Sequence, residues 1–214
     1  MSSPSGAEVS VPIDDFSLSG TLTIGENCKG VVVFAHGSGS SRLSPRNVAV
    51  ANALVDHGCG TLLFDLLTEA EAVDRGNVFD IELLGSRVVS ATRWLKLQDE
   101  SRGLPIGYFG ASTGAAAALV AAAQLGDTVA AVVSRGGRPD LAGAALPRVT
   151  APTLLIVGSL DSAVLDLNRG AQRKLSCQSR LVVVDGATHL FEEPGKLEQV
   201  AQEAGTWFIE KFTG

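Results

Sequence analysis

One serine in the sequence stands in a setting that would make it a nucleophile. Ser112 lies in Gly110-Ala-Ser-Thr-Gly114, directly after the short apolar segment 106–109 and before an alanine-rich segment. A strand, a tight turn and a helix in this order place a serine hydroxyl at the tip of a sharp bend, in front of a helix N-terminus. A hydroxyl held in that way can attack a carbonyl carbon. A serine between glycines can also simply cap the helix that follows it.

A serine nucleophile needs a base to accept its proton and a carboxylate to orient that base. His189, in the loop after the last predicted strand, is the only histidine that follows Ser112 in the chain. Asp161 comes just past a buried strand, and ligands bind at the carboxyl ends of strands in open α/β sheets. We therefore predict Ser112, Asp161 and His189 as catalytic residues. Asp140, after the preceding strand, remains an alternative acid, and Asp161 could instead cap the next helix.

The elements that must position these residues alternate along the chain. Segments 8–16 and 17–24 favour two strands joined without a helix. Apolar runs predict further strands at 29–35, 61–65, 106–109, 129–134, 153–157 and 181–184, and helical spacing or capping signals predict helices at 45–57, 78–97, 115–124, 164–175 and 196–212. Repeated strand–helix alternation predicts an α/β fold: a mostly parallel sheet with an antiparallel start and helices on both faces. We expect a flexible N-terminus over 1–7, a single domain over 8–214, and no large lid.

Composition narrows the class of protein. The chain has 214 residues, 45% of them hydrophobic, and a net charge of −6 without a basic block. These values favour a soluble protein that has neither nucleic acid nor membrane as a partner. Three widely spaced cysteines (Cys28, Cys59 and Cys177) suggest neither a disulfide framework nor a metal site. Since the N-terminus also lacks the features of a signal peptide, we expect a cytoplasmic location. The sequence leaves the oligomeric state open.

These motifs, together with His36-Gly37 after a predicted strand, resemble the α/β-hydrolase superfamily over nearly the whole chain. In that superfamily the nucleophile, the acid and the histidine follow each other in this order. The resemblance implies an oxyanion hole formed by the backbone N–H groups of Ser38 and Thr113, with His36 and Gly37 structuring the loop. It also implies that no cofactor or metal is needed.

In its small size and its lack of a predicted lid, the chain resembles the dienelactone-hydrolase-like branch of the superfamily. Dienelactone hydrolase itself uses a cysteine as its nucleophile, whereas this chain has Ser112. Its lactone chemistry is therefore not carried over. A competing interpretation is a dinucleotide site, because Gly37-x-Gly39 follows a strand and Asp65 ends the next one. Arg42 stands where that fingerprint needs its third glycine, which argues against it.

The predicted function is a small serine hydrolase, similar to carboxylesterases, that cleaves an ester, lactone or thioester of a small molecule through an acyl-enzyme. An acyltransferase or a perhydrolase would use the same residues, and a non-catalytic relative that binds a small molecule is a further alternative. Arg42, Arg135 and Arg138 lie in loops after strand ends. They could bind a carboxylate or phosphate of the substrate. They could equally be solvated or form internal ion pairs.

Overall fold

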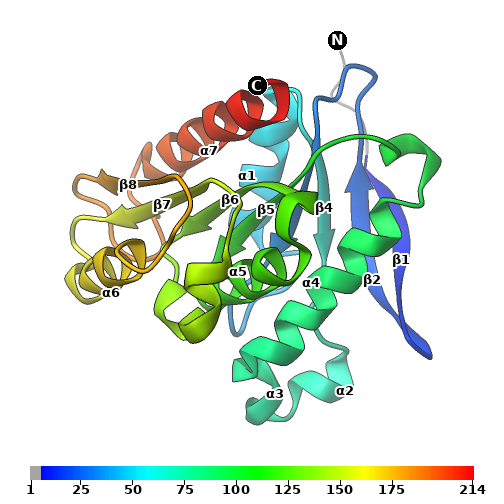
Figure 1. The fold of residues 1–214 in the computed structure, drawn as a ribbon, viewed down its shortest axis with the longest axis horizontal. Coiled ribbons are helices and arrows are strands. Elements are labelled where there is room, and N and C mark those ends of the chain that lie inside the picture. The colour runs from blue at the N-terminus through cyan, green and yellow to red at the C-terminus, as the bar shows by residue number, and fades with distance from the viewer. Residues whose placement is uncertain (1–5) are drawn as a thin grey trace.

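The computed structural model describes residues 6–214 and has an eight-stranded sheet between two layers of helices (Figure 1). The strands are β1 (Ala7–Ile13), β2 (Phe16–Thr23), β3 (Val31–Ala35), β4 (Gly60–Phe64), β5 (Ile106–Ala111), β6 (Val129–Arg135), β7 (Thr153–Gly158) and β8 (Ser179–Val184). Their order in the sheet is β1-β2-β4-β3-β5-β6-β7-β8. The predicted α/β class is thereby confirmed.

The sheet starts antiparallel and continues parallel, as the sequence predicts. Strand β2 pairs antiparallel with both β1 and β4, and every pairing from β4 onward is parallel. The two-residue turn between β1 and β2 contains Asp14 with a φ of 44°. Positive φ is what the tight turns of twisted hairpins require, and aspartate tolerates it.

Helices cover both faces of the sheet. They are α1 (Pro45–Asp56), α2 (Glu69–Ala72), α3 (Arg75–Phe79), α4 (Ile81–Leu95), α5 (Thr113–Leu125), α6 (Ser162–Gln172) and α7 (Lys196–Thr213). Helices α4 and α5 pack on one face, with a core that includes Tyr108, and α1 and α7 pack on the other, with a core that includes Phe109. Strands β3 to β7 are buried almost throughout because both of their faces are covered.

The structure corrects the predicted helix 78–97. The chain ends α3 at Phe79 and starts α4 at Ile81, because the Asp80 carboxylate caps α4 by accepting a hydrogen bond from the Leu83 N–H at 2.9 Å. The short α2 was not predicted, although Thr68 and Glu71 form a capping box at its start. Of the predicted flexible N-terminus, Ala7 already belongs to β1, and residues 1–5 lie outside the described residues.

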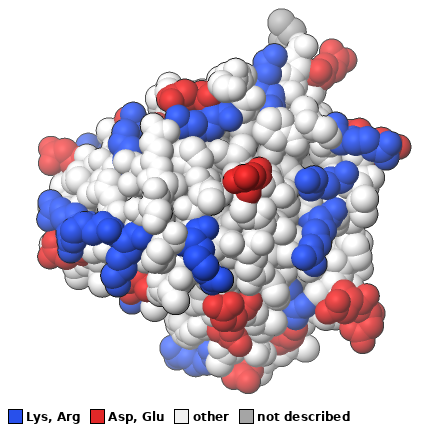
Figure 2. All heavy atoms as spheres, viewed as in Figure 1, with Lys and Arg blue, Asp and Glu red and all other residues white. Residues whose placement is uncertain are grey.

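Within residues 6–214, no lid is inserted between the strands of the sheet. The connection from β6 to β7 contains only short 3₁₀ turns between Pro139 and Arg148, with a kink at Gly143. Within residues 6–214, none of the helices has the length and apolar character that crossing a membrane requires. On the face drawn in Figure 2, acidic and basic side chains are interspersed.

The turn between β5 and α5 is packed too tightly for ordinary side chains. A Cβ atom added at Gly114 would lie 2.1 Å from the carbonyl oxygen of Ala35 and 2.5 Å from that of His36. Glycine is therefore required there by the close approach of two backbone segments.

Gly114→Ala should lower the free energy of unfolding by about 3 kcal/mol or more, because two backbone carbonyls must move to admit the methyl group. Gly170→Ala is a matched control, since Gly170 also lies in a helix and a methyl group there would meet only a distant Arg173 atom at 3.8 Å. That control should leave stability unchanged or raise it slightly. Urea unfolding followed by circular dichroism measures both. Equal stability of the two variants would contradict this account of the turn.

Candidate active site

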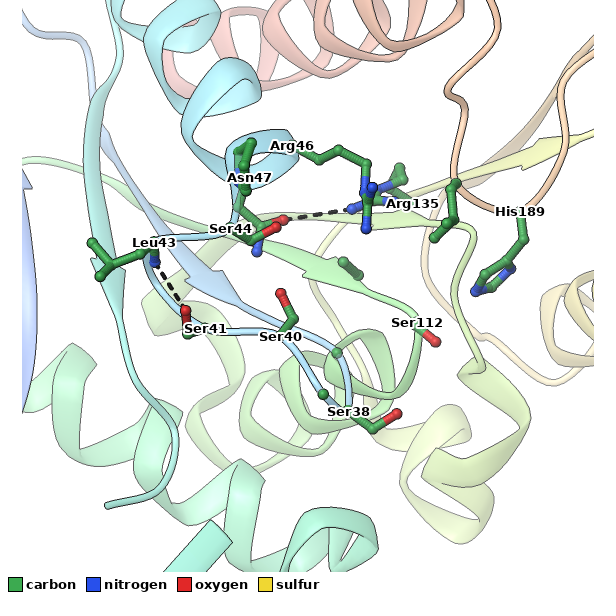
Figure 3. Close-up of a pocket in the computed structure, with 15 residues that line it drawn as sticks. Ser38, Ser40, Ser41, Leu43, Ser44, Arg46, Asn47, Ser112, Arg135 and His189 are labelled. Carbon is green, nitrogen blue, oxygen red and sulfur yellow. Dashed lines mark hydrogen bonds between the residues drawn. The ribbon is translucent and has the colours of Figure 1, made fainter. Parts of the chain in front are cut away.

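Ser112 sits at the strained turn between β5 and α5. Its φ is 51° and its ψ is −122°, a conformation that costs a non-glycine residue of the order of 1–3 kcal/mol. It occupies the N-cap position of α5, yet its hydroxyl makes no capping hydrogen bond. The hydroxyl instead faces a cavity (Figure 3). The capping role considered for this serine is therefore absent.

His189 and Asp161 meet at the carboxyl ends of β8 and β7. The Nδ1 atom of His189 lies 2.6 Å from an Asp161 carboxylate oxygen. Asp161 occupies the N-cap position of α6 without capping it, so its carboxylate is directed to the histidine instead. The Asp161 side chain is 16% exposed and that of His189 is 39% exposed, which leaves the imidazole open to the cavity.

The structure brings His189 and Ser112 to one cavity without a direct hydrogen bond between them in the part of the chain that it describes. Figure 3 shows both side chains facing the same space. Nucleophile and base are often further apart than hydrogen-bond distance when no substrate is bound. The loop that carries His189 is anchored by Phe191, which is fully buried.

The alternative acid Asp140 is engaged elsewhere. Its two carboxylate oxygens accept hydrogen bonds from the Arg138 guanidinium at 2.9 and 2.8 Å. These hydrogen bonds and the charge of Asp140 raise the pKa of Arg138. Among the two carboxylates considered, only Asp161 contacts His189.

The loop after β3 packs directly on Ser112. A Cβ atom at Gly37 would lie 2.9 Å from the Ser112 Cβ, so only glycine fits here. The Ser38 N–H, predicted as an oxyanion donor, donates to the Thr113 hydroxyl at 2.9 Å in this structure. The Thr113 N–H lies in the first turn of α5, where backbone N–H groups have no acceptor within the helix.

His36 stabilises this loop through hydrogen bonds of both ring nitrogens to the backbone. Its Nε2 atom accepts a hydrogen bond from the Leu66 N–H at 3.1 Å, so the proton resides on Nδ1 and is donated to the Gly37 carbonyl at 3.0 Å. Both ring nitrogens are thus satisfied in the neutral imidazole. Burial lowers the pKa of His36 below its ordinary value, which favours the neutral form of the ring.

Two cavities flank the loop. The first, of about 650 Å³, is lined by Ser112, His189, Arg135 and the segments 37–41 and 43–47. The second, of about 590 Å³, lies across the loop and has more apolar walls, which include Leu66 and Val78. Their sizes suit small-molecule ligands.

The three predicted arginines have different surroundings. Arg42 forms ion pairs with Asp65 and Glu8 and lines the second cavity, while Arg138 is held by Asp140. We do not carry these two forward as substrate ligands, because carboxylates of the chain already occupy them. Arg135 lines the first cavity.

Arg46, which is not among the arginines predicted from the sequence, lines the first cavity as well. Its position gave the signal: it follows Pro45 at the start of a helix that begins shortly after a strand end. Within residues 6–214 there is no group of three or more histidine, cysteine, aspartate or glutamate side chains arranged to hold a metal ion.

Comparison with known proteins identifies the family. No family model matches the chain. A crystal structure of dienelactone hydrolase from Anabaena variabilis ATCC 29413 is 53% identical and superimposes with a TM-score of 0.95, covering 98% of this chain and 99% of that one. The chain belongs to the dienelactone hydrolase family. This confirms the predicted resemblance, and it shows that the molecule has the hydrolase fold.

Other similar proteins support the fold of this dienelactone hydrolase family member, but two of them have names that point to a different activity. Est1E from Butyrivibrio proteoclasticus is 17% identical with a TM-score of 0.81, covering 97% of this chain and 99% of that one, and shows the fold alone. Two curated Mycobacterium tuberculosis proteins, from strains CDC 1551 / Oshkosh and ATCC 25618 / H37Rv, are each 59% identical over 207 residues, or 97% of this chain. Both are named "Putative phosphoribosyl transferase", but the chain spans only 47% of their length.

Acid should destabilise the fold through His36. Because its pKa in the folded chain is below its ordinary value of 6.5, the unfolded chain binds a proton more readily as the pH falls. The resulting stability is complete above about pH 7 and is lost as the pH falls through the lowered pKa.

His36→Gln keeps an acceptor for the Leu66 N–H and does not titrate. It should flatten the dependence of the free energy of unfolding on pH between about pH 7 and 5, measured by urea titration. His57→Gln, at a partly exposed histidine at the end of α1, is the control. An equal flattening by both substitutions would contradict the role given to His36.

Proposed function

We propose that this protein is a serine hydrolase that cleaves an ester, lactone or thioester of a small molecule through an acyl-enzyme. The observation that carries the proposal is the 2.6 Å contact of Asp161 with His189, which lines the same cavity as Ser112. An acid, a base and a hydroxyl from three different strand ends have few structural reasons to converge there. Catalysis by an activated serine is a chemical reason for it.

In the proposed reaction, the Nε2 atom of His189 accepts the proton of the Ser112 hydroxyl while Oγ attacks the carbonyl carbon. The Asp161 carboxylate accepts a hydrogen bond from the Nδ1–H of His189, which leaves Nε2 free to act as the base, and it stabilises the imidazolium that forms. His189 then donates its proton to the leaving alcohol or thiol. Water attacks the acyl-enzyme with help from the same histidine, and the acid is released.

The oxyanion would be stabilised by the N–H groups of Thr113 and Ser38. In the structure the Ser38 N–H is held by the neutral Thr113 hydroxyl. An oxyanion is a stronger acceptor, because hydrogen bonds to charged groups are about twice as strong as neutral ones. We therefore expect the Ser38 N–H to turn from the hydroxyl to the oxyanion as charge develops.

The same residues would serve an acyltransferase or a perhydrolase, since those enzymes differ in the acceptor that attacks the acyl-enzyme. The cavity leaves room for water, and no lid covers the site in the described part of the chain. These features favour hydrolysis. A relative that only binds a ligand would have no need of the contact between Asp161 and His189.

A fluorophosphonate probe should label the wild-type protein covalently and should not label Ser112→Ala, because the probe reacts with activated serines. Mass spectrometry of the intact protein measures the label, and Ser40→Ala, at a second serine in the same cavity, is the control that should retain it. Absence of labelling in the wild type, together with no turnover of phenyl acetate, would refute the enzymatic function. It would leave the binding-only relative as the better interpretation.

Asp161→Asn should lower kcat for an aryl ester by about four orders of magnitude, because the amide no longer holds the histidine in the required tautomer. Asp140→Asn should change kcat only slightly, since that carboxylate contacts Arg138 and not His189. Steady-state kinetics of both variants compare the two acids. A larger loss in Asp140→Asn would transfer the acid role to the earlier strand end.

A further inference from the structure

Two arginines on one wall of the active-site cavity lack a counter-charge. Arg135, at the end of β6, is only 6% exposed, and Arg46 is the second residue of α1. Figure 3 shows the Arg46 side chain reaching toward Arg135. Within residues 6–214, no carboxylate lies within 4.0 Å of either guanidinium, and no acidic residue lines this cavity. We call this pair the arginine wall.

The few contacts of Arg135 do not satisfy its buried guanidinium. One terminal nitrogen reaches the Asn47 amide oxygen at 3.5 Å, and among the described residues the Nε atom has no hydrogen-bond partner. The ring of Phe191 lies 6.0 Å from the guanidinium carbon. The other buried arginine among the described residues, Arg87, also has an Nε atom without a partner, but its charge is paired with Glu71 at 2.7 Å.

Burying the unpaired guanidinium of Arg135 costs free energy unless an anion binds beside it. Burial, with the nearby charge of Arg46, lowers the pKa of Arg135 to about 10, so the Arg135 side chain remains cationic at neutral pH. A buried cation without a partner loses its hydration and gains little in return. A negatively charged ligand group would neutralise both side chains and satisfy the free N–H donors.

The N-terminus of α1 adds to the positive charge of the two arginines at this cavity. This helix has 12 residues, its first turn contains no acidic residue, and the N-cap Ser44 makes no side-chain capping hydrogen bond. Pro45 at its first position has no N–H, so the first N–H groups without an acceptor in the helix are those of Arg46 and Asn47, and both residues line the cavity. The positive end of the helix dipole therefore lies at the cavity, which is a typical setting for a bound anion. The hydroxyls of Ser40, Ser41 and Ser44 line the cavity between α1 and Ser112.

We propose that the arginine wall and the N-terminus of α1 bind a phosphate monoester group of the substrate, so that the enzyme cleaves an acyl ester in a molecule that also carries a phosphate. The donors exceed what a carboxylate can use, since it has two oxygens and one negative charge. A phosphate monoester has three peripheral oxygens and a charge of about −1.5 to −2, which matches two guanidinium groups and helix N–H donors.

The sheet places this phosphate beside the reacting serine. Ala111 of β5 stands in register with Arg135 of β6, and the Ser112 N–H donates to the Arg135 carbonyl at 3.3 Å. The carbonyl under attack and the phosphate would thus occupy two parts of one cavity. The assignment of the phosphate to a substrate rests on the proposed function, whereas anion binding by the wall does not.

Binding is tested first, in a protein that cannot turn over. Inorganic phosphate should bind saturably to Ser112→Ala in isothermal titration calorimetry at low ionic strength. Adding Arg46→Ala should weaken this binding by about tenfold or more, the effect of losing one charged hydrogen-bonding partner. Adding Arg169→Ala, which removes an exposed arginine paired with Asp166, should change it little. Acetate at equal ionic strength should bind more weakly than phosphate.

Kinetics then test the substrate. In the wild type, kcat/KM should be greater for para-acetoxyphenyl phosphate than for neutral phenyl acetate, so the ratio of the two values should exceed one. The ratio should fall by about tenfold in Arg46→Ala and in Arg135→Met, and should persist in Arg169→Ala. Arg46 is only partly buried, so Arg46→Ala keeps the test valid should Arg135→Met fail to fold.

The outcomes separate the two proposals. If phenyl acetate is cleaved but phosphate does not bind, or if the ratio is unchanged in Arg46→Ala, the phosphate site is wrong and the hydrolase stands. If phosphate binds and depends on Arg46 but no ester is cleaved, the anion site stands and the hydrolase is wrong. A preference for para-acetoxybenzoate over the phosphate ester, lost in the same variants, would overturn the phosphate assignment in favour of a carboxylate.

Discussion

The close approach of the β3 loop to the start of α5 is the constraint on which the site depends. Gly37 contacts Ser112, and Gly114 contacts the carbonyl oxygens of Ala35 and His36, at distances that exclude a Cβ atom. Because these segments touch backbone to backbone, the loop that carries Ser38, a proposed oxyanion donor, cannot move independently of Ser112, the proposed nucleophile. The same packing holds Ser112 at a φ of 51°, which an isolated turn would relax.

The order of the strands then decides which residue stands beside which. Asp161 and His189 follow β7 and β8, which are neighbours in the sheet, so their side chains meet directly. Strand β6 separates β7 from β5, the strand that precedes Ser112. Arg135, the last residue of β6, therefore stands at the carboxyl edge of the sheet between the strand ends that carry Ser112 and Asp161. A cation in the cavity is a consequence of sheet topology combined with one residue choice.

Much of this could be predicted from sequence because it depends on short segments. Apolar runs identified the buried strands, and motif and chain order selected Ser112, Asp161 and His189, which line or adjoin one cavity. The break between α3 and α4 at Asp80 could not be predicted, because the helical spacing of apolar residues continues across this capping residue. The ion pairs of the loop arginines could not be predicted either, because partners such as Arg42 and Asp65 are distant in sequence and come together only in the folded chain. The engagement of the Ser38 N–H by Thr113 depends on a contact between residues 75 positions apart.

The contrast between the whole molecule and the cavity shows why net charge says little about a ligand. The chain carries a net charge of −6, and the face in Figure 2 mixes both signs. Surface charges are screened beyond about 10 Å, whereas charges that line a cavity with apolar walls act on a ligand at close range. The arginine wall has two cations and a helix N-terminus without a lining carboxylate. We therefore expect a bound molecule to experience a positive potential there, although the protein is acidic overall. An acidic composition argues against a polyanion that must cover the surface, but it does not argue against a small anion held inside.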